Sequence, residues 1–133
     1  MELFTIKSPC EGLYKEKGSK FISLAYPVAD ESEAKDIVKA IRKKYHDARH
    51  KCYAFRLGDK AEKVRTADDG EPPHSAGSQI LGRLASLSLT NVLLVVVRYF
   101  GGTKLGLPGL IRAYRTAAEE ALGKAEIIVF EAT

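Results

Sequence analysis

One short stretch constrains the fold of this chain more than any other: the apolar run at residues 92–97, which leads into a glycine-rich loop. Four of its six residues are β-branched, and six residues are far too few to span a membrane. The run therefore predicts a strand that is buried on both faces of a sheet. Pro108 then fits the first turn of a helix. Four glycines lie between strand and helix or at the helix start: Gly101, Gly102, Gly106 and Gly109.

The glycine loop has two interpretations. Free backbone N–H groups at a helix start attract anions, and glycines let a ligand approach them closely. However, Leu107 and Pro108 stand where a phosphate-binding P-loop has Lys and Ser or Thr, and the chain contains no GxGxxG. The alternative is a structural loop, in which the glycines satisfy positive φ angles and close packing.

The remaining pattern predicts a single domain over residues 1–133. Asp30 and Glu33 have capping-box spacing before an amphipathic segment. Residues 59–78 predict a long polar loop. The predicted strands are 12–17, 20–28, 51–57, 92–97 and 126–131, and the predicted helices are 31–46, 78–88 and 108–122. This order predicts an α+β two-layer sandwich, with a mixed sheet and the helices on one face.

Charge and cysteine content narrow the class of protein. The net charge is +4, and the first 66 residues carry 15 Lys and Arg against 10 Asp and Glu, so a basic face is possible. Cys10 and Cys52 are the only cysteines, and the sequence shows neither a secretory leader nor an apolar run of membrane-spanning length. We therefore expect a cytoplasmic protein with free thiols and no membrane partner.

An acidic segment precedes the apolar run. Asp68, Asp69 and Glu71 could attract a divalent cation or supply an acid and a base, but acidic turns around glycine are common. These carboxylates could instead cap the following helix, or pair with Arg98 or Arg112 and so fold the acidic loop against the glycine loop.

Other catalytic and metal-binding patterns are weak. His46, His50 and Cys52 lack the paired spacing of structural zinc sites. Ser75 follows His74, but neighbouring residues rarely face each other as a catalytic triad requires. We therefore predict no catalytic residue, no metal site and no cofactor.

Aromatic and basic side chains alternate around the glycine loop, a combination that can stack bases and hold phosphates. Lys104 is the most informative of them, because a lysine at a glycine loop tip has little structural reason to be there. The predicted RNA or anion site, which faces the acidic loop, consists of Arg98, Tyr99, Gly101, Gly102, Lys104, Arg112 and Arg115.

Several motifs together resemble the IMPACT/YigZ family: SKF at 19–21, HxCYAFRLG at 50–58, ADDGEP at 67–72 and RYFGGxxLG at 98–106. The resemblance implies an N-terminal domain with the fold of the second domain of a small-subunit ribosomal protein. The ferredoxin-like domain that often follows in the family is absent from residues 1–133. The family usually has Gly where His74 stands and Pro where Gln79 stands. Eukaryotic relatives are translational regulators that compete for an activator of an initiation-factor kinase.

These observations favour a non-catalytic binding module, associated with RNA, the ribosome or a translation factor and acting in translation regulation. DNA specificity is not expected. One alternative is a nucleotide-binding or phosphoryl-transfer enzyme that uses the glycine loop, which rests on fold analogy. The other is a protein–protein interaction domain.

Overall fold

A five-stranded sheet forms the middle layer of the structure, a computed structural model that describes residues 2–132. Its strand order is β2-β3-β6-β4-β5, and every pairing in it is antiparallel. The strands β3 and β4 run in the same direction, but β6 lies between them, so the expected mixed sheet has no parallel pair. The strands are β2 (Cys10–Glu16), β3 (Ser19–Pro27), β4 (His50–Leu57), β5 (Lys63–Ala67) and β6 (Val92–Tyr99).

The central strand β6 confirms the prediction made for residues 92–97, because all six of these side chains are fully buried. Successive side chains of a strand point to opposite faces. Val92, Leu94 and Val96 enter one hydrophobic cluster, while the residues between them enter a second cluster on the other face.

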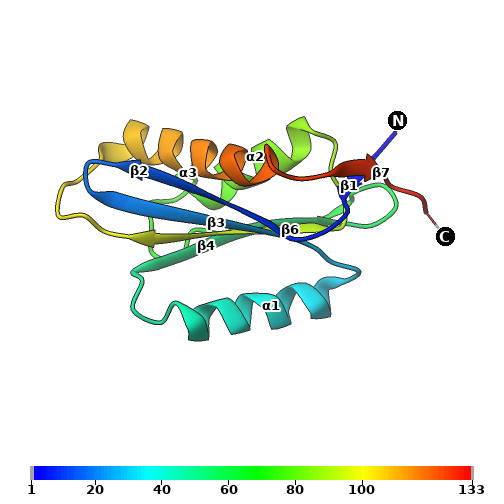
Figure 1. Cartoon of the computed structure of the whole chain (residues 1–133), viewed down its shortest axis with the longest axis horizontal. Helices are drawn as coiled ribbons and strands as arrows, with labels where there is room; N and C mark the ends of the chain where they lie inside the picture. Colours follow the sequence, from blue (N-terminus) through cyan, green and yellow to red (C-terminus); the bar gives the residue numbers. More distant parts are fainter. Residues whose placement is uncertain (1, 133) are drawn as a thin grey trace.

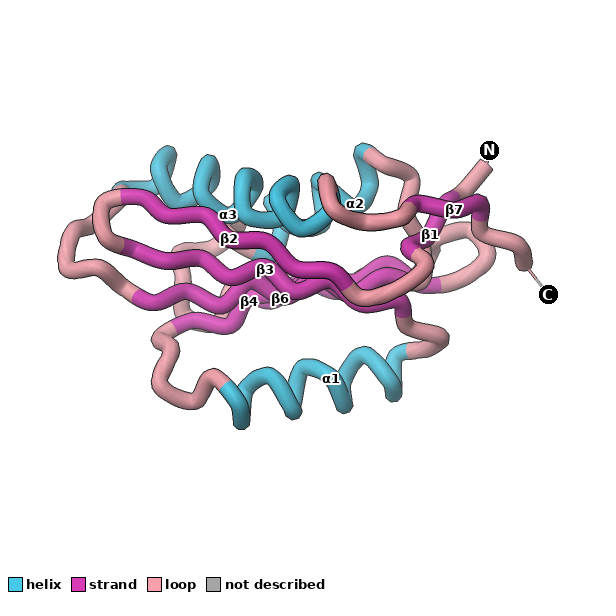
Figure 2. The backbone as a smooth tube through the Cα atoms, in the orientation of Figure 1, coloured by secondary structure: helices cyan, strands magenta, loops and turns pink. Residues whose placement is uncertain are grey.

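Helices cover both faces of the sheet. The helices α2 (Gly77–Ser86) and α3 (Gly106–Leu122) lie on one face, and α1 (Glu31–Lys44) lies on the other (Figures 1 and 2). The predicted α+β sandwich is confirmed, but the expectation of helices on one face is wrong for α1, which adds a third layer. A strand that is apolar on both sides requires cover on both sides, whereas the periodicity of a helix does not specify which face of the sheet it covers.

The capping box predicted for α1 is present. The Asp30 side chain accepts a hydrogen bond from the backbone N–H of Glu33 at 2.8 Å, and Glu33 reaches back to the N–H of Ala29 at 2.6 Å. The first bond satisfies an N–H group that a helix start leaves unpaired, while the second goes to the residue before the N-cap and not to the N-cap N–H of a standard capping box.

The two ends of the described chain pair with each other. The strands β1 (Phe4–Ile6) and β7 (Ile127–Val129) form a separate antiparallel ribbon (Figure 1). The strand predicted at 126–131 is thus confirmed, while β1 and β5 were not predicted. Within residues 2–132, no helix is long and apolar enough to cross a membrane.

Candidate functional site

Two neighbouring residues at the end of β6 point to opposite layers. Arg98 enters the layer of α2 and α3, where its guanidinium lies 5.5 Å from the centre of the Phe21 ring. Tyr99 packs in the layer of α1 and donates a hydrogen bond to Asp47 at 2.9 Å. Burial and this hydrogen bond raise the pKa of the Tyr99 hydroxyl. The two side chains therefore lie on opposite faces of the sheet and cannot form one site.

A buried ion pair connects the central strand to the acidic loop. Arg98 Nη1 lies 2.8 Å from Glu71 Oε2, and the Tyr114 hydroxyl donates to the same oxygen. Arg98 is 5% exposed and Glu71 7% exposed. Burial of both charges without such pairing would be costly. Of the two arginines that the sequence left open as partners for these carboxylates, Arg98 pairs with Glu71, whereas Arg112 pairs with Glu16.

The other two carboxylates of the acidic loop also have partners. Asp68 accepts hydrogen bonds from the backbone N–H groups of His74 at 3.0 Å and Gly77 at 2.9 Å, so it caps the start of α2 as the sequence suggested. Asp69 accepts one from the N–H of Lys51 at 2.8 Å. Among residues 2–132, no three His, Cys, Asp or Glu side chains are grouped so that they could hold a metal ion.

The two departures from the family pattern lie in one chain of hydrogen bonds. His74 has a φ of +67°, in the left-handed region that glycine adopts most easily, so a glycine would fit this position without strain. The Gln79 amide donates to the backbone oxygen of His74 at 3.1 Å and accepts from Arg115 at 3.1 Å. The predicted site residue Arg115 therefore contacts the first turn of α2 and does not line the cavity described below.

Two glycines of the loop after β6 have structural reasons to be there. A Cβ on Gly101 would lie 2.0 Å from the carbonyl carbon of Gly18 in the β2–β3 turn, which is far inside van der Waals contact. Gly102 has a φ of +90°, which side-chain-bearing residues rarely adopt. These features favour the structural interpretation of the loop at these two positions.

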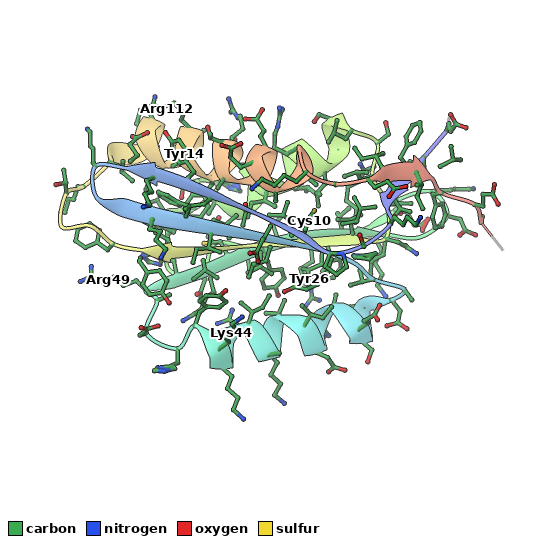
Figure 3. The ribbon with its side chains drawn as sticks, in the orientation of Figure 1. Cys10, Tyr14, Tyr26, Lys44, Arg49 and Arg112 are labelled. Carbon is green, nitrogen blue, oxygen red and sulfur yellow. The ribbon has the colours of Figure 1, made fainter. Side chains whose placement is uncertain are left out.

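Arg112 lies on the outer side of α3 and does not line the cavity described below. Its guanidinium is 3.5 Å from Glu16 Oε2, and the Tyr14 hydroxyl donates to the other oxygen of Glu16. In Figure 3, Arg112 and Tyr14 lie close together beside α3, well separated from Arg49. The hydrogen bond from Tyr14, followed by the Arg112 charge, lowers the pKa of Glu16, and the same hydrogen bond raises the pKa of Tyr14.

A cavity of about 350 Å³ lies between the glycine loop, the start of α3 and the acidic loop. Two cations lie near the Phe100 ring there: Arg49 is 4.6 Å and Arg98 is 5.5 Å from its centre. Lys104 is exposed at the edge of the cavity. The residues on which its chemistry depends are Arg49, Glu71, Arg98, Phe100, Lys104 and Leu107. We call this space the glycine-loop cavity.

Sequence reasoning missed Arg49. It lies just before β4, and the antiparallel register of β4 and β6 places its neighbour His50 opposite Arg98. His50 also lines the cavity, where its Nε2 is 3.6 Å from Glu71 Oε1. The pairing of two distant strands cannot be derived from either strand alone, so no local signal in the sequence identified Arg49.

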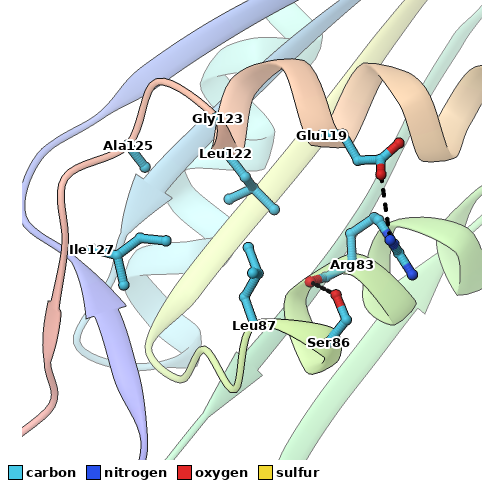
Figure 4. Close-up of a pocket in the computed structure, with 8 residues that line it drawn as sticks. All are labelled: Arg83, Ser86, Leu87, Glu119, Leu122, Gly123, Ala125 and Ile127. Carbon is cyan, nitrogen blue, oxygen red and sulfur yellow. Dashed lines mark hydrogen bonds and ion pairs between the residues drawn. The ribbon is translucent and has the colours of Figure 1, made fainter.

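A second cavity, of about 420 Å³, lies between the last turns of α2 and α3 and the start of β7 (Figure 4). An ion pair between Arg83 and Glu119, at 3.4 Å, closes one side of it. The other side is apolar and carries Leu87, which is 40% exposed, and Ile127, which is 41% exposed. This cavity offers an apolar surface rather than a charged site.

Neither the Cys52 thiol nor the Ser75 hydroxyl is placed as an activated nucleophile. The Cys52 thiol is buried, and burial raises its pKa well above the usual range. A reactive thiol needs a lowered pKa. The buried Ser75 hydroxyl donates to the backbone oxygen of Pro72 at 2.6 Å.

The family model described as "Impact N-terminal domain" matches residues 17–122. The three-layer α+β fold with its glycine-loop cavity is therefore a domain of the Impact N-terminal type. The chain belongs to the IMPACT family, as its motifs indicated. It is 37% identical over 125 residues to the IMPACT family member YvyE of Bacillus subtilis, covering 94% of this chain and 58% of that protein.

Two further similar proteins are also named IMPACT family members. A Thermus thermophilus IMPACT family member is 44% identical over 107 residues, covering 80% of this chain and 56% of that protein. The Escherichia coli member YigZ is 37% identical over 108 residues, covering 80% and 53%. The chain thus spans little more than half the length of these curated relatives.

Two solved structures share the fold. A protein described as hypothetical superposes with a TM-score of 0.91 at 30% identity, covering 97% of this chain and 64% of that one. The two-domain translational regulator Yih1 superposes with a TM-score of 0.52 at 26% identity, covering 94% and 48%.

Proposed function

We propose that this chain is a non-catalytic binding module that acts in translation regulation by contacting RNA, ribosomal RNA included, through the glycine-loop cavity and its exposed edge. The observation that carries the proposal is the placement of Arg49 and Lys104 beside Phe100. Both cations are exposed, and neither has an ion-pair partner within residues 2–132. The description of Yih1 as a translational regulator supports the biological setting.

The charge balance of the cavity suits a polyanion. The charge of Arg98 is compensated by Glu71, so Arg49 and Lys104 supply the uncompensated positive charge. Each phosphate that such a cation neutralises releases counterions, which makes binding favourable at low salt. Phe100 offers an aromatic surface of the kind on which unpaired bases stack. The proposed interface differs from the predicted set of seven residues: Arg98 and Lys104 line the cavity, whereas the other five do not, namely Tyr99, Gly101, Gly102, Arg112 and Arg115.

The test is a fluorescence-anisotropy titration of labelled single-stranded RNA at two salt concentrations. We expect the Arg49→Ala, Lys104→Ala double variant to bind at least tenfold more weakly than the wild type. A matched control, Lys39→Ala with Lys60→Ala, removes the same charge from exposed positions outside the cavity and should change affinity less than twofold. Equal losses in the two variants, or no RNA binding by the wild type at 50 mM salt, would overturn the proposal.

Protein–protein contact is the second candidate function, because the structure exposes a contiguous apolar segment. Ile127, Ile128 and Val129 are all exposed on β7, close to Leu87 at the second cavity. Apolar patches of this kind are typical of protein interaction surfaces. A pull-down from nuclease-treated lysate with the wild type and with Ile128→Lys distinguishes this function from RNA binding. Loss of a protein partner in the variant, with RNA affinity unchanged, would favour it.

The phosphoryl-transfer alternative stays a prediction with its own test. A nucleotide at a hundred times its dissociation constant should stabilise the fold by about 2.7 kcal/mol. The absence of a thermal shift with ATP or GTP and magnesium would count against it.

A further inference from the structure

The glycine-loop cavity is lined by both charged and apolar side chains. Lys104 and Arg49 are exposed cations at its edge, and Leu105, Leu107 and Leu110 form an apolar part of its wall. Its volume of about 350 Å³ is near the lower limit for small-molecule sites. A ligand that fits must therefore be small, and must combine an anionic group with an apolar or aromatic body.

Arg98 has an unused hydrogen-bond donor at this cavity. Its side chain is 6% exposed, its Nη1 contacts Glu71 and its Nη2 lies 3.4 Å from the Ser19 hydroxyl. Its Nε, by contrast, has no hydrogen-bond partner among the described residues. Buried donors are nearly always paired, so an orphaned one in the wall of a cavity points to an acceptor supplied by a ligand.

The first turn of α3 adds further donors. Gly106 and Leu107 line the cavity, and no side chain caps the start of the helix. The first backbone N–H groups of a helix have no partner within the helix, and they attract anions. Together with Lys104, this end of the cavity suits a phosphate. The Glu71 carboxylate, held by Arg98 on another side, would repel a phosphate and so favours its placement toward Lys104.

We infer that the glycine-loop cavity binds a single nucleotide unit, with its phosphate toward Lys104 and the start of α3 and its base against Phe100 and Leu110, one turn further along the helix. This inference rests on the proposed function, since it names the part of the RNA that the module holds. His50 and Glu71 provide polar groups for the edge of the base. The unit is either a free nucleoside monophosphate or one unstacked nucleotide of a single strand, because both present the same chemistry.

A cavity of this size cannot admit a base that is paired in a duplex. Proteins read RNA bases mainly where the strand is single and the base can turn outward. Single-stranded RNA should therefore compete with a free nucleotide for the cavity, whereas duplex RNA should not. This competition separates the two sources of the ligand.

The experiment is a titration of the ¹⁵N-labelled full chain with UMP, AMP and inorganic phosphate, followed by amide chemical shifts. We expect saturable shifts with UMP or AMP at residues 49–50, 98–100 and 104–107, and weaker binding of phosphate alone. Leu107→Glu introduces a carboxylate at a wall position that is 51% exposed, so the fold should persist. It should weaken nucleotide binding at least tenfold. The matched control Leu87→Glu makes the same change at the second cavity and should have less than a twofold effect.

The outcomes separate the inference from the function on which it rests. If RNA binding depends on Arg49 and Lys104 but UMP and AMP shift no cavity amide, the nucleotide site is overturned and the proposed function stands. Phosphate that binds as tightly as UMP and AMP also overturns the nucleotide site. If nucleotides bind in the cavity and single-stranded RNA neither binds nor competes, the RNA function falls and the ligand is a free nucleotide. Competition by single-stranded RNA supports both.

Discussion

The buried ion pair between Arg98 and Glu71 makes the sharpest stability prediction. At the 2.8 Å separation of its charged atoms, an effective dielectric constant of 20 gives an attraction of about 6 kcal/mol. Much of this attraction is offset by the cost of removing both charges from water. If one partner alone is removed, the attraction is lost, while the remaining charge is still buried and still carries its desolvation cost. Arg98→Met should therefore reduce the free energy of unfolding by about 3–5 kcal/mol.

A double-mutant cycle measured by urea denaturation tests this reasoning. Glu71→Leu combined with Arg98→Met removes both charges, so the double variant should be more stable than the sum of the single losses implies, by about 2–3 kcal/mol. The partly exposed pair of Arg83 and Glu119 serves as a control. Arg83→Met should cost less than about 1 kcal/mol. If Arg98→Met costs no more than Arg83→Met, or if the two single losses simply add, the pair does not hold the acidic loop as described.

Three further predictions concern separate features. Gly101→Ala should reduce the free energy of unfolding measured in urea by about 1–3 kcal/mol, because the added Cβ meets backbone atoms. Gly82→Ala is the control: the space around Gly82 is open, so the free energy of unfolding should stay the same or rise. Tyr14→Phe should lower the free energy of unfolding at pH 7, because it removes the hydrogen bond that holds the folded-state pKa of Glu16 below its unfolded value. The difference from the wild type should shrink as the pH falls below about 4, where Glu16 becomes protonated. A difference that stays constant with pH would contradict this. The buried Cys52 thiol should react with a disulfide reagent only after unfolding.

The sequence predicted those elements whose pattern is local. The β-branched run of β6 and the capping box of α1 each specify their own structure within a few residues. The strand β5 was missed because its sequence KVRTA is mostly exposed at the edge of the sheet, where apolar alternation is not required. The strand β1 was missed because three residues form it, and its partner β7 lies at the other end of the chain.

The candidate site was predicted in part for the same reason. The joining of Glu71 to Arg98 was anticipated from opposite charges in two loops, and it is present. The separation of Tyr99 from Arg98 follows from the alternation of a strand, but the choice of which residue faces the cavity depended on where α1 and α3 pack. Arg49 required the register between β4 and β6, which is a property of the whole sheet.

The salt dependence of RNA binding tests the central claim most directly. The logarithm of the binding constant for single-stranded RNA falls with the logarithm of salt concentration, by about 0.7 for each phosphate contacted. If Arg49 and Lys104 each contact a phosphate, the Arg49→Ala, Lys104→Ala variant should have a slope shallower than the wild type by about 1.4. An unchanged slope would contradict the claim that the glycine-loop cavity is the contact surface.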